Sequence, residues 1–408
     1  FNLNYFSWIL LVIYLHIFTC KIYNLVTNIK EFQIIKTFYN LDLLIDDSEL
    51  STMKWQEVIS KFKNVYQDDN INIYYINNKI SIKDNYFITL IDKNCLKLDY
   101  LNELMEWNIQ YCFINSLFKE DFKLKNDFIL LTDDFIKTVE KKIKYIAILN
   151  FIFMPFILVY LIFYDLFKYG ERFYNKPQLI FLRHWTKFAK WKFRNYNELY
   201  HESHDKFVTS YKYCNEYSAQ FPNRILGTFS KLIVFILSAF FVVLVLISII
   251  NENILLNLYI VETKTTIWFI GVFASFIAIF NSFIKEKIIF YPKEKLKNIR
   301  NVINNIPQQW TEEDNYKVKS KMFTLYQLQI ITLVNDIITT LKIPFKLYKL
   351  SINTKNILEY LQHITINHPT YGHINKFSLF TYNHCKDKKT LLSIETFKTN
   401  NSGWQLIS

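Results

Sequence analysis

The chain has 408 residues, a formal net charge of +12 and a mean hydropathy of only +0.06. Long apolar runs alternate with charged stretches, which excludes both a wholly water-soluble domain and a bundle of membrane helices joined by short loops. The five cysteines lie far apart without a C-x-x-C pair. The sequence therefore predicts no disulfide framework, no metal site and no cofactor.

The first apolar run opens the chain. Residues 1–26 are expected to form a transmembrane helix, because the run Phe1 to Cys20 carries no charge and Lys21 follows it. A cleaved signal peptide is the alternative, but the run lacks a basic start and a small-residue cleavage site. Residues 27–144 mix apolar and charged residues at helical spacing, which predicts a cytosolic, mostly helical domain.

A second apolar run, Ile146 to Tyr164, contains Pro155 and has basic residues on both sides. At about 1.5 Å per residue it is long enough to cross a hydrocarbon core of roughly 30 Å. Lys and Arg near membrane segments stay on the cytoplasmic side. Two basic flanks therefore favour a re-entrant segment over residues 145–168 that turns near Pro155, with an ordinary crossing as the alternative.

Residues 169–231 are basic and aromatic and are predicted to form cytosolic helices. Projected as a helix, residues 185–199 separate into an apolar face and a charged face. The apolar face holds Trp185, Phe188, Ala189, Tyr196 and Leu199, and the charged face holds Lys187, Lys190, Arg194 and Glu198. Such a helix either contacts headgroups and the membrane domain, which its position favours, or packs within the cytosolic domain.

The clearest topological signal is a pair of charge-free runs. Residues 232–250 and 265–284 are expected to be transmembrane helices joined by a short luminal loop, residues 251–264. The loop is slightly acidic and both outer flanks are strongly basic, which places the loop outside the cytosol. Residues 285–321 are then cytosolic.

The last apolar stretch covers residues 322–347 and is interrupted by Asn335 and Asp336, with Pro344 near its end. An ionisable residue inside hydrocarbon is costly unless it faces protein or water. We therefore expect a second re-entrant segment here, turning near Pro344. Residues 348–408 are predicted to be a cytosolic C-terminal region.

The sequence contains no strong catalytic or metal-binding motif. The histidines of His201-Glu-Ser-His204-Asp205 are three residues apart, so they do not share a helix face as in a zinc motif, and a polar turn is the better interpretation. The chain has no phosphate-binding loop and no nucleophile elbow, so an enzyme is not expected. The basic residues cluster at membrane edges, where they set topology and bind anionic headgroups, so nucleic-acid binding is not expected either.

Several short motifs point to one family. In chain order they include Trp55-Gln-Glu-Val58, Glu106-Trp-Asn108, Tyr169-Gly-Glu171 and Gln220-Phe-Pro222. The most specific motif joins Trp191, Lys192, Phe193 and Arg194 to Asn197, Glu198 and Leu199, after an apolar segment that contains proline. On these residues the chain resembles the autophagy-related protein 9 family, multispanning membrane proteins of autophagosome formation, over nearly its whole length.

The resemblance implies an all-α membrane protein: a domain-swapped homotrimer with four spans and two re-entrant segments per protomer and with cytosolic tails. In that pattern residues 1–26 correspond to the family's second span. Family members resemble lipid scramblases, which equilibrate phospholipids between leaflets without ATP. They are expected on Golgi- and endosome-derived vesicles, at the preautophagosomal structure and on the isolation membrane, with a lipid-transfer protein of the autophagy-related protein 2 family as partner.

A phospholipid headgroup that crosses bare hydrocarbon must shed its hydration, at a cost of several kcal/mol or more. A wet, polar-lined path removes much of that barrier. The candidates for such a lining are Glu171, Arg172, Lys176, Ser275, Asn281, Asn335 and Asp336. The family has a charged cluster before the position of Pro177, and here Lys176 alone keeps a charge.

Two other functions are compatible with the sequence. The membrane helices could anchor a scaffold that recruits lipid-transfer and tethering proteins. An ion channel or transporter is less well supported, because the sequence shows no selectivity motif and no inverted repeat.

Overall fold

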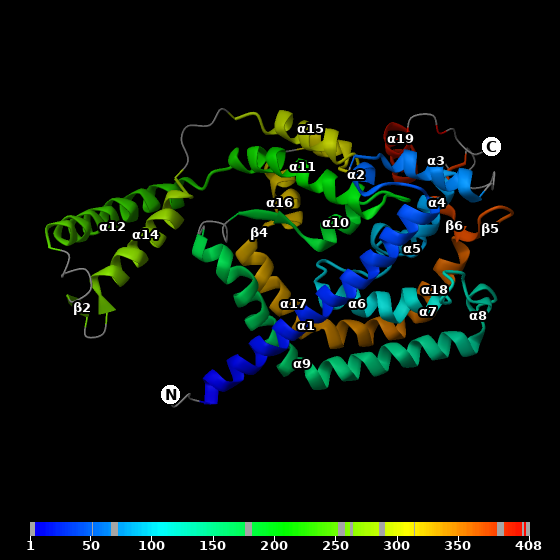
Figure 1. The fold of residues 1–408 in the computed structure, drawn as a ribbon, viewed down its shortest axis with the longest axis horizontal. Helices are drawn as coiled ribbons and strands as arrows, with labels where there is room; N and C mark the ends of the chain where they lie inside the picture. Colours follow the sequence, from blue (N-terminus) through cyan, green and yellow to red (C-terminus); the bar gives the residue numbers. More distant parts are fainter. Residues whose placement is uncertain are drawn as a thin grey trace. The chain divides into compact units, whose positions relative to one another are not determined.

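The computed structural model describes residues 5–50, 52–66, 72–175, 182–251, 258–261, 264–284, 290–313, 315–381, 387–401 and 404. Most of these residues are helical, and the described strands form three two-stranded sheets (Figure 1). The chain divides into two compact units. The first unit comprises Phe1–Tyr164, Lys190–Asp205 and Asp336–Ser408, and the second comprises Asp165–Ala189 and Lys206–Asn335.

Helices α9, α10, α11 and α17 begin in one unit and end in the other. The other elements of the first unit are α1 (Tyr5–Thr37), η1 (Phe38–Asp42), α2 (Asp47–Leu50), α3 (Trp55–Tyr66), α4 (Ile73–Ile80), α5 (Ile82–Asp92), α6 (Glu103–Ile109), η2 (Gln110–Ile114), α7 (Asn115–Leu117), α8 (Asn126–Ile129), α18 (Thr354–His363), β5 (Thr365–His368), β6 (Gly372–Asn375), η5 (Lys376–Ser378) and α19 (Lys388–Asn400).

The elements of the second unit are β1 (Arg183–Trp185), α12 (Arg224–Ile250), β2 (Tyr259–Val261), β3 (Lys264–Thr265), α14 (Thr266–Asn281), α15 (Pro292–Val302), η4 (Gln308–Thr311), α16 (Asn315–Leu325) and β4 (Tyr326–Leu328). The four shared helices are α9 (Asp133–Asn175), α10 (Lys187–Phe193), α11 (Tyr200–Ala219) and α17 (Gln329–Ile352).

An aromatic cluster forms part of the core of the first unit. The ring of Tyr74 on α4 is fully buried and lies 5.4 Å from that of Phe380 and 5.8 Å from that of Trp404. Its hydroxyl donates to the Ser378 carbonyl at 2.8 Å. The C-terminal residues of the chain therefore complete a core that α4 begins.

Asn197 is the centre of a second, polar part of this core, which we call the Asn197 node. Its side-chain oxygen accepts hydrogen bonds from Asn85 at 2.8 Å and from Asn78 at 3.0 Å. Its own amide group donates to the Ser378 carbonyl at 2.8 Å, and its backbone N–H donates to Asn85 Oδ1 at 2.9 Å. Asn197 is fully buried and its φ is +57°, a left-handed conformation that asparagine tolerates better than most residues. The node joins α4, α5 and η5.

The prediction of one amphipathic helix over residues 185–199 is wrong. The chain forms β1, then α10, then an irregular segment, then α11. Thr186 accepts a hydrogen bond from Ala189 N and so caps the start of α10, and the left-handed Asn197 prevents α10 from continuing into α11.

The headgroup-contact interpretation of this motif is also wrong for most of its residues, because they are buried. The buried motif residues are Trp185, Phe193, Arg194, Asn197, Glu198 and Leu199. Arg194 forms an ion pair with Asp84 at 2.8 Å, and Glu198 accepts from Asn195 N at 2.7 Å. Trp191 is half-buried against Phe87, and only the Lys192 side chain is exposed. Packing inside the protein explains the motif.

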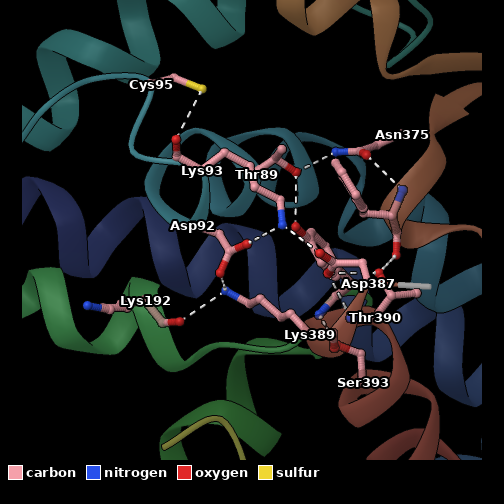
Figure 2. A network of polar contacts seen from close by, with 12 residues as sticks. Thr89, Asp92, Lys93, Cys95, Lys192, Asn375, Asp387, Lys389, Thr390 and Ser393 are labelled. Atoms are coloured by element: carbon pink, nitrogen blue, oxygen red, sulfur yellow. Dashed lines mark hydrogen bonds and ion pairs between the residues drawn. The ribbon is translucent and has the colours of Figure 1, made fainter. Parts of the chain in front are cut away.

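A charged network ties α19 to α5 within the first unit (Figure 2). Lys93 Nζ lies 2.6 Å from Asp387 Oδ1 and 3.0 Å from Asp92 Oδ2. Lys389 reaches Asp92 at 3.5 Å and donates to the Lys192 carbonyl at 3.0 Å. Burial acts to raise the pKa of the Asp387 carboxyl, but the hydrogen bond and charge of Lys93, together with the backbone N–H groups of Thr390 and Lys389, outweigh it and hold that pKa below its ordinary value of 3.8. The charges of two lysines and two carboxylates balance, so the network is best explained as a structural link between α19 and α5.

The second unit is built around the antiparallel pair β1–β4, in which Trp185 faces Tyr326. The Trp185 indole donates to Ser210 Oγ on α11 at 2.9 Å. Met322 and Tyr326 are fully buried in this core. The predicted re-entrant segment 322–347 is therefore wrong at its start: its first residues belong to α16 and β4, and the apolar helix α17 begins only at Gln329.

Neither predicted turn at a proline is present. α9 continues through Pro155 and α17 through Pro344. A proline inside a helix removes one hydrogen bond and bends the axis without necessarily ending the helix, and Figure 1 shows α9 bent near its middle. The re-entrant topology of both segments stays a prediction.

Two described helical stretches, Asp133–Lys168 and Arg224–Ile250, are long and apolar enough to cross a membrane, with 17% and 6% of their most apolar windows buried. α14 is shorter than the predicted span 265–284, because the helix ends at Asn281. α1 extends past the predicted boundary at residue 26 as far as Thr37, since no proline or glycine interrupts it. Residues 1–4 of the first predicted span, much of the loop 251–264, and residues 285–289 lie outside the described residues.

We expect Asn197→Ala to destabilise the first unit by about 2–4 kcal/mol, because it leaves buried amide groups without partners. Asn197→Gly should be less harmful by up to about 1 kcal/mol, since glycine accepts the positive φ without strain. The melting temperature of the purified protein in detergent measures both effects. Asn400→Ala, at the exposed end of α19, is the matched control, and an Asn197→Ala protein that melts with the parent would contradict the role of the node.

Asp387→Asn tests the charged network while preserving the cap on α19, because asparagine still accepts from Thr390 N. The depressed pKa of Asp387 contributes stability above pH 3.8, and this contribution is lost as the pH falls through the folded-state pKa. The substitution should cost on the order of 1 kcal/mol at pH 7, and the difference from the parent should shrink below about pH 4. Melting curves between pH 3 and pH 7 check this, with the exposed Asp205→Asn as control. A pH-independent difference would assign the effect to packing.

Candidate functional site

A pocket of about 1050 Å³ lies at the base of the α12–α14 hairpin in the second unit. We call it the basal pocket. It is lined by the segment that joins α11 to α12, the first two turns of α12, the residues after α14, Phe290 before α15, and α16. Three cationic side chains line it, Arg224, Lys231 and Lys319, and the described lining contains no carboxylate.

The local sequence explains how α12 presents two of these cations. Asn223 accepts a hydrogen bond from Leu226 N at 3.2 Å and caps the helix immediately before Arg224. Lys231 follows seven residues later, about two turns along the same face. Both residues therefore lie on the pocket side of α12, and Arg224 lies at the positive end of the helix dipole.

Gly227 brings the two arms of the hairpin together. A Cβ atom built at this position would lie 3.4 Å from the Phe283 carbonyl oxygen, at the limit of ordinary contact. On another wall, Gln220 Oε1 accepts from Tyr291 N at 2.8 Å and holds the segment before α15 against the end of α11. Both Gly227 and Gln220 line the pocket.

Aromatic rings form the remaining wall. The Phe221 ring lies 5.6 Å from that of Phe290 and 6.2 Å from that of Phe323. The Lys319 ammonium sits 5.2 Å from the Phe221 centroid, a cation–π contact. Among the described residues, no carboxylate forms an ion pair with Lys319.

A fourth cation packs against Phe323, a ring that contacts Phe221 of this wall. The Arg183 guanidinium carbon lies 3.6 Å from the Phe323 centroid, and its Nη1 donates to the Tyr326 carbonyl at 3.1 Å. Burial lowers the pKa of this guanidinium. Arg183 orients the aromatic wall and is not among the residues that line the pocket.

The arrangement suits a phosphate group at a membrane surface. Three cations, a helix N-terminus and no described acid attract a phosphate oxygen. The pocket also lies at the end of an apolar hairpin whose side chains are largely unburied. It therefore combines charge for a headgroup with a neighbouring apolar surface for acyl chains.

The predicted lipid-path residues occupy different places. In α14, Ser275 Oγ donates to the Gly271 carbonyl at 2.9 Å, and Asn281 is exposed in the last turn. Asn335 donates to Gln327 Oε1 at 3.0 Å. Asp336, in the first unit, accepts from the Tyr100 hydroxyl at 3.0 Å.

The side chains of three further candidates lie outside the described part of the structure. Glu171 and Arg172 belong to α9, with their side chains outside the described part, and Lys176 lies outside the described residues altogether. Ser275, Asn335 and Asp336 each hydrogen-bond to a different residue. The sequence did not predict that Arg224, Lys231 and Lys319 line one pocket; it placed them only in the basic flanks of the apolar runs. The Gln220-Phe-Pro222 motif, which lies directly beside Arg224, was the available signal.

Comparison with known proteins gives a consistent result. Residues 1–381 match the family model described as "Autophagy protein ATG9". The chain is 27% identical over 97% of its length to autophagy-related protein 9 of Dictyostelium discoideum, and 28% identical over 91% to that of Eremothecium gossypii. It is also similar to the cryo-EM structure of Schizosaccharomyces pombe Atg9, with a TM-score of 0.68, 25% identity and coverage of 92% of this chain and 88% of that chain.

The chain spans 62% of the length of the Dictyostelium relative and 44% of that of the Eremothecium relative. The match to the family model nevertheless covers most of this chain, including the whole second unit with the basal pocket and the first unit as far as residue 381. The chain therefore belongs to the autophagy protein ATG9 family.

Proposed function

We propose that this protein is a passive, ATP-independent phospholipid scramblase of autophagy. It would equilibrate lipids between the leaflets of vesicles and of the growing isolation membrane, so that the autophagosome can expand. The observation that carries the proposal is the basal pocket, a cationic cavity at the foot of an apolar hairpin. Membership of an autophagy family supports the cellular process.

The barrier to lipid exchange is desolvation of the headgroup. A phosphate held by Arg224, Lys231 and Lys319 exchanges water for charged partners before it leaves the surface. The acyl chains would meanwhile contact the exposed apolar side of α12, where Phe235 is 74% exposed and Ile225 is 84% exposed. The pocket then solvates the headgroup while apolar surface solvates the acyl chains, which lowers the free-energy barrier to lipid exchange between leaflets.

The assembly and the partners follow from the family as further parts of the proposal. We expect a domain-swapped homotrimer on Golgi- and endosome-derived vesicles, with cytosolic tails. A lipid-transfer protein of the autophagy-related protein 2 family would deliver lipid to one leaflet, and scrambling would redistribute it. The alternative is a non-scrambling scaffold, which the extensive packed core of the first unit favours because it offers a rigid platform for protein partners.

The triple variant Arg224→Gln, Lys231→Gln and Lys319→Gln should slow scrambling on the order of tenfold, because each cation contributes about 1 kcal/mol to headgroup binding and not all of it is expressed in the rate. Purified protein is reconstituted in liposomes that contain a fluorescent phospholipid. An impermeant quencher then bleaches the outer leaflet at once and the inner leaflet only as fast as lipids exchange.

Lys212→Gln, Lys293→Gln and Lys297→Gln form the matched control, since these exposed lysines of the same unit do not line the pocket. The parent protein and the control should let the quencher reach more than half of the label. Bleaching that stops at the outer leaflet for the parent would reject scrambling and favour the scaffold. Equal rates for the two triple variants would reject the role of the basal pocket.

A further inference from the structure

One side of α17 in the first unit exposes a continuous apolar stripe. Its residues recur at spacings of three and four: Ile338, Leu341, Phe345, Tyr348 and Ile352, with exposed fractions from 39% to 66%. We call this set the α17 stripe. The Phe345 ring lies 6.3 Å from that of Phe151 on α9, which is itself 55% exposed. The stripe is therefore part of a wider apolar surface that continues onto α9.

A row of lysines follows one edge of the stripe. At 100° per residue, Lys342, Lys346 and Lys349 fall within about 60° of one another and next to the apolar residues. An apolar stripe bordered by lysines is typical of a helix at the boundary between hydrocarbon and headgroups. This pattern identifies the partner of the surface as a membrane with negative charge.

A second pocket, of about 450 Å³, lies beyond the lysine row. We call it the α17 pocket. Its walls are the loop of residues 95–99, the part of α17 that contains Lys346, Lys349 and Leu350, and the start of α18. The lysine row thus lies between the apolar stripe and a cavity within the same unit.

The α17 pocket is positively charged and offers neutral donors. Lys97, Lys346 and Lys349 line it, with Asp99 as the one acidic residue of the described lining. Lys346 is half-buried, and no carboxylate of the described residues forms an ion pair with it. Burial raises the pKa of Tyr360 to about 12, so its hydroxyl stays a neutral group that can donate.

We propose that the α17 pocket binds the phosphomonoester headgroup of an anionic lipid, with the acyl chains leaving along the α17 stripe. A phosphomonoester carries about −1.5 to −2 charges near neutral pH and presents three acceptor oxygens, which matches three ammonium groups opposed by one carboxylate. A zwitterionic headgroup carries its own cation, so it gains less binding free energy from the three lysines. The proposal depends on membrane association and not on scrambling.

The test uses the full chain in a non-ionic detergent and measures binding of dioctanoyl phosphatidic acid by calorimetry. Lys346→Gln with Lys349→Gln should weaken binding about fivefold, because about 1 kcal/mol is expected for each cation and half of it is screened. Asp99→Asn should tighten binding about threefold, since it removes the opposing charge. If the double lysine variant folds poorly, Asp99→Asn still tests the site.

The controls separate the sources of phosphate and the type of lipid. Lys355→Gln with Lys398→Gln, two exposed lysines that do not line the pocket, should bind like the parent. Dioctanoyl phosphatidylcholine and glycerol 3-phosphate should each bind at least about tenfold more weakly than phosphatidic acid.

Equal binding of phosphatidylcholine would overturn the charge assignment, and equal binding of glycerol 3-phosphate would overturn the lipid assignment. Unchanged affinity in both the lysine variant and Asp99→Asn would overturn the site. Scrambling that fails in liposomes while phosphatidic acid still binds would reject the proposed function alone.

Discussion

The hydrogen bonds of one buried amide, Asn197, are the constraint on which the first unit depends. Unpaired polar groups in a core cost about 1–3 kcal/mol each, and here the Asn197 side chain pairs with the amide groups of Asn78 and Asn85 and with the Ser378 carbonyl. The groups come from distant parts of the sequence, so the pairing forms only when α4, α5 and η5 are all in place. The left-handed backbone of Asn197 also turns the chain in the segment between α10 and α11. One residue thus sets both the local path and the packing.

A different constraint governs the apolar helices. In α12 and in the apolar part of α9 most side chains are unburied, and contiguous apolar surface of this size has to be covered by lipid or by another protein. Their backbone groups are satisfied within the helices, as hydrocarbon requires. Charge is consequently confined to their ends. The basal pocket at the end of the α12–α14 hairpin is a direct result of this separation.

Under the two proposals, the two cationic pockets would divide the handling of lipid between the two compact units. The basal pocket has no described acid and an open aromatic wall, which fits transient contact with a moving headgroup. The α17 pocket is smaller, includes Asp99 and is built on a well-packed core, which fits retention of a particular headgroup. Exchange of bulk phospholipid and recognition of an anionic lipid can therefore be separate properties of one chain.

The sequence by itself determined the family, the mostly helical class and the apolar hairpin, because runs without charge and specific motifs are local properties. It did not determine the break of residues 185–199 into β1, α10 and α11, or the entry of Met322 and Tyr326 into a core. Helical periodicity cannot distinguish an apolar face that meets lipid from one that meets protein. Nor could helical periodicity show that Arg224, Lys231 and Lys319 line the same pocket. Only the tertiary structure decided these points, since burial and proximity depend on what the rest of the chain places alongside each residue.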